Sequence, residues 1–274
     1  MTTSGVVGRM PFYVLTGALA IIFLFPLVWS AVASVSPQGA TGQTHGYGLG
    51  NYATLFDFGA GLPRFFLNSL IVSVLTVAIT LTVSLFGGYA FARFDFPGRE
   101  LLFLVTLAIL MVPYATLLIP LYVLLNMLGL QNSLVGLALV LSMYQLPFAM
   151  FMMRISFEAV PRELEDAALV DGCGSFAALR KILMPAVVPG LITVGLFAFL
   201  AAWNDFFAPL ILISDPRQAP LPLAIATLRQ QTMGAIDYGA TEAGVVVMAL
   251  PCVVLFLVLQ RYYVRGFMSG AVKG

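Results

Sequence analysis

Charged side chains are scarce in this sequence: Asp, Glu, Lys and Arg together make up 9% of its 274 residues. Soluble domains carry about a quarter charged residues, so this scarcity excludes an ordinary water-soluble domain. Hydrophobic residues make up 61% of the chain, and several apolar runs exceed the roughly 20 residues that a helix needs to cross a bilayer. The composition therefore predicts an all-α polytopic membrane protein.

Histidine and cysteine are nearly absent. The one histidine, His45, falls in a stretch rich in Gly, Ser, Thr and Asn, and the two cysteines are Cys173, in a polar stretch, and Cys252, in an apolar run. One loop histidine cannot support a catalytic triad, and no Cys/His cluster has metal-ligand spacing. The sequence therefore argues against an enzyme, a metal site and a disulfide. The net charge of +1 gives no basis for binding nucleic acid.

Six apolar stretches are candidate transmembrane helices of a single membrane domain. They are residues 12–35, 65–92, 101–120, 134–153, 187–213 and 243–262. The first is longer than the apolar part of a cleaved signal peptide, although Ala31-Val32-Ala33 imitates a cleavage site. Pro113 and Pro120 interrupt the third apolar run, and proline kinks helices. We expect that span to end near Pro120, with a short apolar segment beyond it.

Lysine and arginine are unevenly distributed among the segments between these spans. If both termini are cytoplasmic, ten lie inside (Arg9, Arg93, Arg99, Arg154, Arg162, Arg180, Lys181, Arg261, Arg265, Lys273) and three outside (Arg64, Arg217, Arg229). Cytoplasmic segments of membrane proteins carry the excess of these residues. We therefore expect both termini, and the polar stretch 158–185, on the cytoplasmic side, and residues 36–63 in an external loop.

The stretch 158–185, EAVPRELEDAALVDGCGSFAALRKILMP, is the longest polar interruption between the later spans. Pro161 can open a helix, since its missing N–H is not needed in the first turn. Gly172 can end that helix in the left-handed conformation, and Ser175 can cap a second one. We expect two short helices around a stiff glycine turn. From these properties alone, an amphipathic surface hairpin and a docking site for another protein are equally good interpretations.

Several residues of this stretch resemble the cytoplasmic motif of binding-protein-dependent ABC importer permeases, which is Glu-Ala-Ala, three residues, Gly, nine residues, Ile, any residue, Leu-Pro. The matching positions are Asp166, Ala167, Ala168, Gly172, Ile182 and Pro185. The spacing is intact, while Asp166 replaces the motif's Glu and Met184 its Leu. Asp171 before Gly172 resembles the carbohydrate-uptake branch.

Short pieces elsewhere in the chain resemble the maltose-type permease subunit with six spans. They are Asn51-Tyr52, Asn68-Ser69, the run Gly88 to Arg93, Trp203-Asn204-Asp205 and the tail Gly270 to Gly274. The resemblance implies the type I ABC importer permease fold, with six transmembrane helices and a cytoplasmic coupling-helix loop at residues 156–185. It also implies a multi-pass subunit of the bacterial inner membrane that forms half of the path for a sugar or sugar derivative.

The same resemblance implies partners. A second permease subunit would complete a heterodimer in membrane lipid, and an extracytoplasmic solute-binding protein or lipoprotein would deliver the solute. Two ATPase subunits would grip the coupling-helix loop through Glu165, Asp166, Ala167, Ala168, Asp171, Gly172, Ile182 and Pro185. The sequence contains no G-x-x-x-x-G-K-[ST] phosphate loop. We therefore expect ATP and Mg on the partner ATPase, and neither cofactor nor enzyme activity in this chain.

Polar side chains within the spans are candidate solute contacts. Trp203, Asn204 and Asp205 lie about 14 to 18 residues past the cytoplasmic end of the fifth span, or roughly 20–27 Å at 1.5 Å per residue. Tryptophan can stack on a sugar ring while Asn and Asp bond hydroxyls. An interfacial aromatic anchor with a helix cap is the alternative. Tyr122, Asn126 and Tyr144 are weaker candidates for the same path.

A secondary transporter or channel is the alternative function. Ion coupling would require carboxylates within the spans, and only Asp205 and Glu242 approach that description, both near the end of a span.

Overall fold

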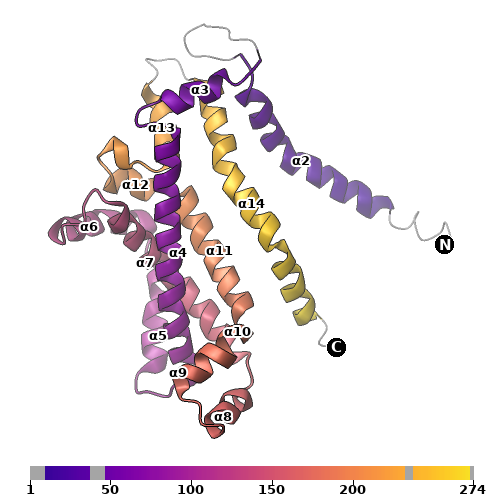
Figure 1. Ribbon diagram of the computed structural model, residues 1–274, viewed down its shortest axis with the longest axis vertical. Helices are drawn as coiled ribbons and strands as arrows, with labels where there is room; N and C mark the ends of the chain where they lie inside the picture. Colours follow the sequence, from indigo (N-terminus) through magenta and orange to yellow (C-terminus); the bar gives the residue numbers. More distant parts are fainter. Residues whose placement is uncertain (1–9, 38–46, 232–236, 272–274) are drawn as a thin grey trace. The chain divides into compact units, whose positions relative to one another are not determined.

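The computed structural model describes residues 10–37, 47–231 and 237–271, which form helices and turns without a strand (Figure 1). In this described part, four helices are long and apolar enough to cross a membrane, and two bent helix pairs raise the number to six. The four helices are α2 (Met10–Ser34), α4 (Leu62–Arg93), α7 (Leu134–Glu158) and α14 (Tyr238–Ala271). The predicted all-α membrane fold is confirmed.

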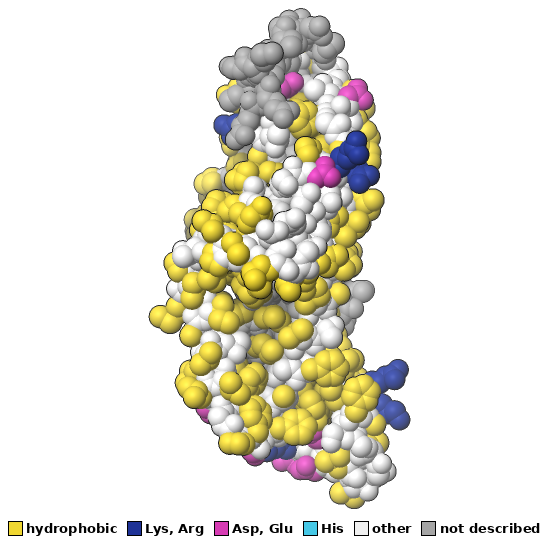
Figure 2. Space-filling view, turned by 90° about the vertical axis from the view of Figure 1, so that its left-hand side faces the viewer, with side chains coloured by type: hydrophobic (Ala, Val, Ile, Leu, Met, Phe, Trp, Pro, Cys, Tyr) yellow, Lys and Arg dark blue, Asp and Glu magenta, His cyan; other side chains and the backbone are white. Residues whose placement is uncertain are grey.

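The chain divides into two compact units, one of residues 1–62 and 225–250 and one of residues 63–224 and 251–274. Hydrophobic side chains cover much of the face shown in Figure 2. An apolar exterior suits a hydrocarbon solvent.

In the first unit, the short helix α3 (Gly50–Asp57) lies within the stretch that we expected to be an external loop. The amide of Asn51 donates to the carbonyl oxygens of Ser34 and Ser36, each at 2.9 Å, and the hydroxyls of Ser34 and Tyr52 are 3.0 Å apart. These bonds tie α3 to the end of α2. His45 lies outside the described residues.

The second unit contains the first bent helix pair. Helix α5 (Arg99–Ala108) continues into the turn η1 (Ile109–Met111), and α6 (Tyr114–Met127) follows at 105°. The chain thus breaks at Pro113, one of the two predicted interruptions, and the helix continues past Pro120, where we expected the span to end. Val112 is extended, with φ −83° and ψ 125°, because the residue before a proline is pushed out of the helical region. Pro120 lies inside α6.

The second bent pair joins the segment Ser175–Ala186 to α11 (Val188–Asn204) at 76°. The helix stops again after Asn204, and α12 (Phe207–Leu212) follows. This second stop lies at the polar triplet Trp203-Asn204-Asp205, inside the apolar stretch 187–213. The turn η3 (Pro216–Gln218) and α13 (Leu221–Gln231) come next in the chain.

Helix α4 carries a buried stripe of small polar residues spaced three or four apart, which are Ser69, Ser73, Thr76, Thr80 and Ser84. A bond of 3.4 Å from Thr76 to the carbonyl oxygen of Ala138 and one of 3.4 Å from Ser142 to that of Thr76 join α4 to α7. Farther along α4, a side chain at Gly88 would meet the backbone of Met153 and Arg154 at 3.0 and 3.1 Å. Small residues thus let α4 and α7 approach closely.

Candidate functional site

The polar loop, residues 156–185, is built as two helical pieces around a glycine turn. Helix α8 (Arg162–Val170) begins after Pro161, and Gly172 has φ +84°, the left-handed conformation that glycine adopts without steric cost. The predicted turn is confirmed. Ser175 is not a cap, because Gly174 occupies the cap position and no side chain bonds there.

The second helical piece is not a regular α-helix. Helix α9 (Ser175–Ala178) runs into a π-helical turn, η2 (Leu179–Leu183), and then into α10 (Met184–Ala186). Within that turn Leu179 and Leu183 are buried, and the turn also holds Arg180 and Lys181, which are exposed. The predicted second helix is present, with a wider turn in its middle.

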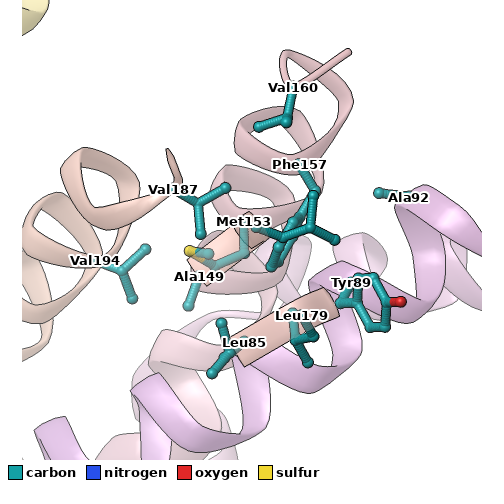
Figure 3. Packing of buried hydrophobic residues seen from close by; sticks show 11 residues of the cluster. Leu85, Tyr89, Ala92, Ala149, Met153, Phe157, Val160, Leu179, Val187 and Val194 are labelled. Atoms are coloured by element: carbon teal, nitrogen blue, oxygen red, sulfur yellow. The ribbon is translucent and has the colours of Figure 1, made fainter. Parts of the chain in front are cut away.

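A hydrophobic cluster anchors the polar loop to three long helices (Figure 3). The cluster consists of Leu85, Tyr89 and Ala92 of α4, of Ala149, Met153 and Phe157 of α7, of Val194 of α11, and of Val160, Leu179, Leu183 and Val187. Met153, Phe157 and Leu183 are fully buried. Deep burial of large side chains stabilises by about 1.5–3 kcal/mol each, so the loop has a firm base.

Polar contacts reinforce this anchor at the first turn of α8. Arg93, at the end of α4, donates through Nη2 to the carbonyl oxygens of Phe157 at 2.9 Å and Val160 at 2.7 Å. Its Nε lies 3.3 Å from Glu165 Oε2, and the Tyr89 hydroxyl donates to Glu165 Oε1 at 2.7 Å. Glu165 therefore faces into the protein rather than toward a partner.

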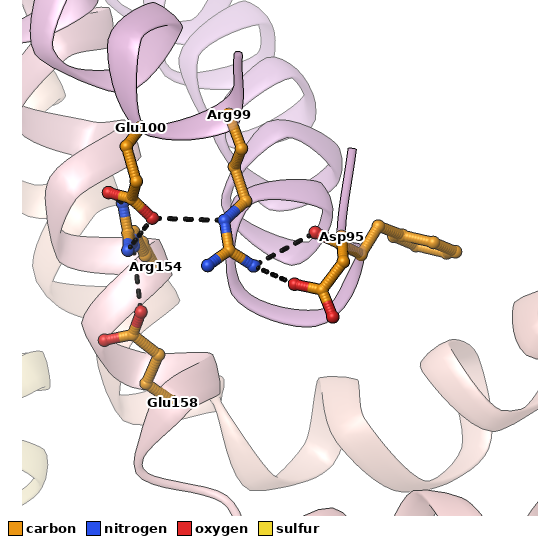
Figure 4. Close-up of polar contacts among 6 residues, drawn as sticks. Asp95, Arg99, Glu100, Arg154 and Glu158 are labelled. Atoms are coloured by element: carbon orange, nitrogen blue, oxygen red, sulfur yellow. Dashed lines mark hydrogen bonds and ion pairs between the residues drawn. The ribbon is translucent and has the colours of Figure 1, made fainter. Parts of the chain in front are cut away.

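A second polar group joins the turn after α4 to the end of α7 (Figure 4). Arg154 binds Glu100 at 2.9 Å and Glu158 at 2.8 Å, while Arg99 binds Asp95 at 2.6 Å and Glu100 at 3.1 Å. The guanidinium of Arg154 also lies 4.3 Å from the centre of the Phe103 ring. These ions are partly solvated, so each pair contributes little to stability, but the group joins both segments.

The outer face of the polar loop is largely unpartnered within this chain. Of the predicted partner-binding residues, Asp166, Ala167, Asp171, Gly172 and Pro185 are exposed, Ile182 is half-buried, and Glu165 and Ala168 point inward. Large apolar side chains are exposed beside them, with Val170 87% and Phe176 66% exposed. The sequence interpretation missed Val170 and Phe176, although apolar residues flanking a glycine turn on a charged segment were a usable signal.

A cavity of about 460 Å³ lies beside the break at Pro113 and the stop of α11 after Asn204. Its lining residues are Ile109, Leu110, Met111, Val112, Pro113, Tyr114, Leu141, Tyr144, Gln145, Ala201 and Asp205. The volume is within the range of roughly 300–1,000 Å³ that ligand pockets span. Discontinuous helices of this kind line solute paths in transporters.

Asp205 joins the two breaks through both of its carboxylate oxygens. The Tyr114 hydroxyl donates to Oδ2 at 2.8 Å, and the backbone N–H of Ala208 donates to Oδ1 at 2.8 Å. The Tyr144 hydroxyl donates to the carbonyl oxygen of Tyr114 at 3.0 Å, with the two rings edge to face at 4.4 Å. Asp205 thus links α6 to the first turn of α12, and no Lys or Arg is among the lining residues.

The predicted solute-path residues do not all meet at this cavity. Asp205 and Tyr144 line it, while Asn204, Tyr122 and Asn126 are exposed and do not. Trp203 is fully buried, with its ring 5.3 Å from that of Phe66 and 5.6 Å from that of Phe199. It is a packing residue here and not a platform for sugar.

Two lining residues, Tyr114 and Gln145, were missed by the sequence interpretation. Tyr114 directly follows Pro113, and a polar residue beside a proline break was the available signal. In the described ranges no three His, Cys, Asp or Glu side chains gather as metal ligands, and the expected absence of a metal or cofactor stays a prediction.

Comparison with known proteins gives consistent results. Residues 83–268 match the family model described as the binding-protein-dependent transport system inner membrane component. The probable ABC transporter permease protein YurM of Bacillus subtilis is 32% identical over 98% of this chain and 90% of its own length. The diacetylchitobiose uptake system permease protein DasC of Streptomyces coelicolor is 33% identical over 93% of this chain and 94% of its own.

A solved structure has the same fold. A chain of a bacterial ABC transporter involved in the import of the acidic polysaccharide alginate superimposes with a TM-score of 0.78 and 21% identity, covering 96% of this chain and 99% of the other.

Proposed function

Because this chain belongs to the family of binding-protein-dependent transport system inner membrane components, we propose that it forms half of the translocation path for a sugar or sugar derivative. In this role a second permease subunit supplies the other half, and an extracytoplasmic binding protein delivers the solute. Two ATPase subunits drive the cycle and hold the ATP and Mg. Lys and Arg are concentrated at the termini and in the polar loop, which supports placing both in the bacterial cytoplasm.

The polar loop is the observation that carries this proposal. It is anchored by the buried cluster around Phe157 and Leu183 and stiffened by the Gly172 turn. Its outer face nevertheless leaves the apolar side chains of Val170 and Phe176 exposed. A rigid projection with uncovered apolar side chains suits docking to a soluble subunit. Force applied to it would reach α4, α7 and α11 together.

The cavity at the helix breaks supports a neutral sugar as the solute. Its polar lining consists of Asp205, Gln145 and two tyrosines. These groups accept and donate hydrogen bonds to hydroxyls, and the aromatic rings can pack on the apolar faces of a sugar. With no cationic side chain in the lining, an anionic sugar would leave its charge unpaired beside Asp205, which is costly away from water. One relative, DasC, is named for the uptake of diacetylchitobiose.

Purification from native membranes tests the proposal. The tagged chain should bring down a second permease and an ATPase, and the complex in proteoliposomes should import a neutral disaccharide only with ATP inside and binding protein outside. Val170→Asp should weaken ATPase attachment about tenfold or more, because it places a charge in an apolar contact. Val170→Ala is the matched control and should retain most of the attachment. Uptake without any ATPase subunit would contradict the proposal.

A further inference from the structure

We infer that Tyr89, Arg93 and Glu165 form a latch through which a movement of α8 pulls directly on the transmembrane helix α4. The inference rests on the coupling role proposed for the polar loop, and it assigns Glu165 to the inside of the protein. Arg93 and Glu165 are then positioning residues that act through the helices they join.

The contacts of the latch are buried. The Arg93 side chain is 4% exposed and that of Glu165 is 13% exposed. Tyr89 and Arg93 are four residues apart on α4 and therefore lie on one face, from which both reach Glu165. The guanidinium also binds two carbonyl oxygens at the end of α7. One cation thus holds α4, the end of α7 and the first turn of α8 together.

The chain itself connects α8 only through turns. Residues 159–161 join it to α7, and the glycine turn at 171–174 joins it to α9. Neither turn reaches α4, so Glu165 supplies a direct side-chain link from α8 to that helix. A buried ion pair resists being pulled apart, since separating it leaves an uncompensated charge away from water.

Glu165 is engaged within the protein, unlike two other acidic residues of α8. Glu163 and Asp166 are exposed and open to solvent or a partner, whereas both oxygens of Glu165 are engaged by α4. The Arg93 Nε is buried without a hydrogen bond of good geometry, although the carboxylate is 3.3 Å away. Buried donors are rarely left unpaired. A small shift of α8 would complete this bond, so the latch can tighten as α8 moves.

A comparison of two glutamates on one helix tests the latch. In the full complex in proteoliposomes, Glu165→Gln should keep ATPase attachment and ATP hydrolysis but lower the number of solute molecules imported per ATP by about tenfold, a typical coupling effect. Glu163→Gln removes the same charge from the exposed side and should leave the ratio unchanged. Equal ratios in the wild type and Glu165→Gln would overturn the inference, as would equal losses in both variants.

The Arg93→Lys variant separates transmission from simple stability. Lysine keeps the charge but lacks the guanidinium fork that reaches carbonyls and carboxylate together. It should therefore lower the ratio less than Glu165→Gln does, and adding it to Glu165→Gln should cause little further loss. If the residues only stabilised the fold, ATP hydrolysis and import would fall in the same proportion, which would overturn the inference.

Amide hydrogen exchange tests the latch separately from the proposed role of the polar loop in coupling. In the purified membrane protein with its bound subunits, the amides of 162–170 should exchange faster in Glu165→Gln than in Glu163→Gln. Equal exchange would refute the latch whatever the ATPase does. Faster exchange in a preparation whose wild type holds no ATPase would support the contact and refute the proposed function.

Discussion

The polar loop and the cavity both interrupt helices of the same unit, yet they present their acidic side chains in opposite ways. In the loop, Asp166 and Asp171 face outward from a base of buried hydrophobic residues. At the cavity, Asp205 is turned inward, and Tyr114 and the N–H of Ala208 engage its two oxygens. An outward acid on a stiff base suits contact with another protein, whereas an inward acid joining two half-helices suits a path for a small solute.

Loss of the buried base should have the largest effect. Phe157→Ala removes a fully buried ring from the cluster and should lower the free energy of unfolding by about 3–5 kcal/mol. Denaturation in detergent would measure this. Phe176→Ala, in the same loop but exposed, should change stability by less than about 0.5 kcal/mol while weakening ATPase attachment. Similar stability losses in the two variants would show that the loop has no distinct buried side.

Disruption of the glycine turn should have the next largest effect. At Gly172, φ is +84°, and a β-branched residue there costs about 1–2 kcal/mol. Gly172→Val should therefore reduce solute uptake while leaving the amount of protein in the membrane unchanged. Gly174→Val is the matched control, because Gly174 has φ −74° and ψ 159° and open space around it. Equal uptake by the two variants would remove the turn from the coupling proposal.

Substitution of Asp205 should have a moderate effect, which should fall mainly on the solute concentration needed for half-maximal uptake. Asp205→Ala loses the hydrogen bond from the Ala208 N–H, worth about 0.5–1.5 kcal/mol, and should raise the half-saturating solute concentration more than it lowers assembly. Asp205→Asn keeps an oxygen that can accept this bond and removes the charge, so it should admit an anionic sugar better than the wild type does. Unchanged transport kinetics in both variants would exclude Asp205 from the solute path.

The smallest effect is expected at the Tyr114 hydroxyl. Tyr114→Phe removes one hydrogen bond to Asp205 and should cost about 0.5–1.5 kcal/mol, seen as a modest change in uptake affinity. Tyr122→Phe alters an exposed hydroxyl on the same helix, outside the cavity lining, and should be silent. A larger effect of Tyr122→Phe would place the path along the other face of α6.

Local rules explain why the polar loop was predictable. Pro161 sets the start of α8 and Gly172 its end, and both effects depend on residues adjacent in the chain. The inward orientation of Glu165 was not predictable in this way, because it depends on Arg93 and Tyr89, more than 70 residues earlier in the chain. The sequence interpretation accordingly placed Glu165 among the residues that face the ATPase.

The cavity, in contrast, was difficult to predict from local rules. Its lining comes from three separated stretches around residues 109–114, 141–145 and 201–205. Either Pro113 or Pro120 could have broken the third span, and the choice depends on packing rather than on proline itself. From the sequence, Trp203 suited either a sugar contact or an interfacial anchor, whereas its contacts with Phe66 and Phe199 place it in the core.

The π-helical turn Leu179–Leu183 holds one residue more than an α-helical turn would. Deleting a single residue there would restore regular winding and swing the preceding piece around its own axis by about 100°, the angle between successive residues of a helix. Leu179 would then leave the cluster, and Phe176 would aim at a different side of the molecule. The extra residue therefore sets the direction in which the outer face of the polar loop points. A one-residue deletion in the turn would redirect that face while leaving its exposed side chains in place in the sequence.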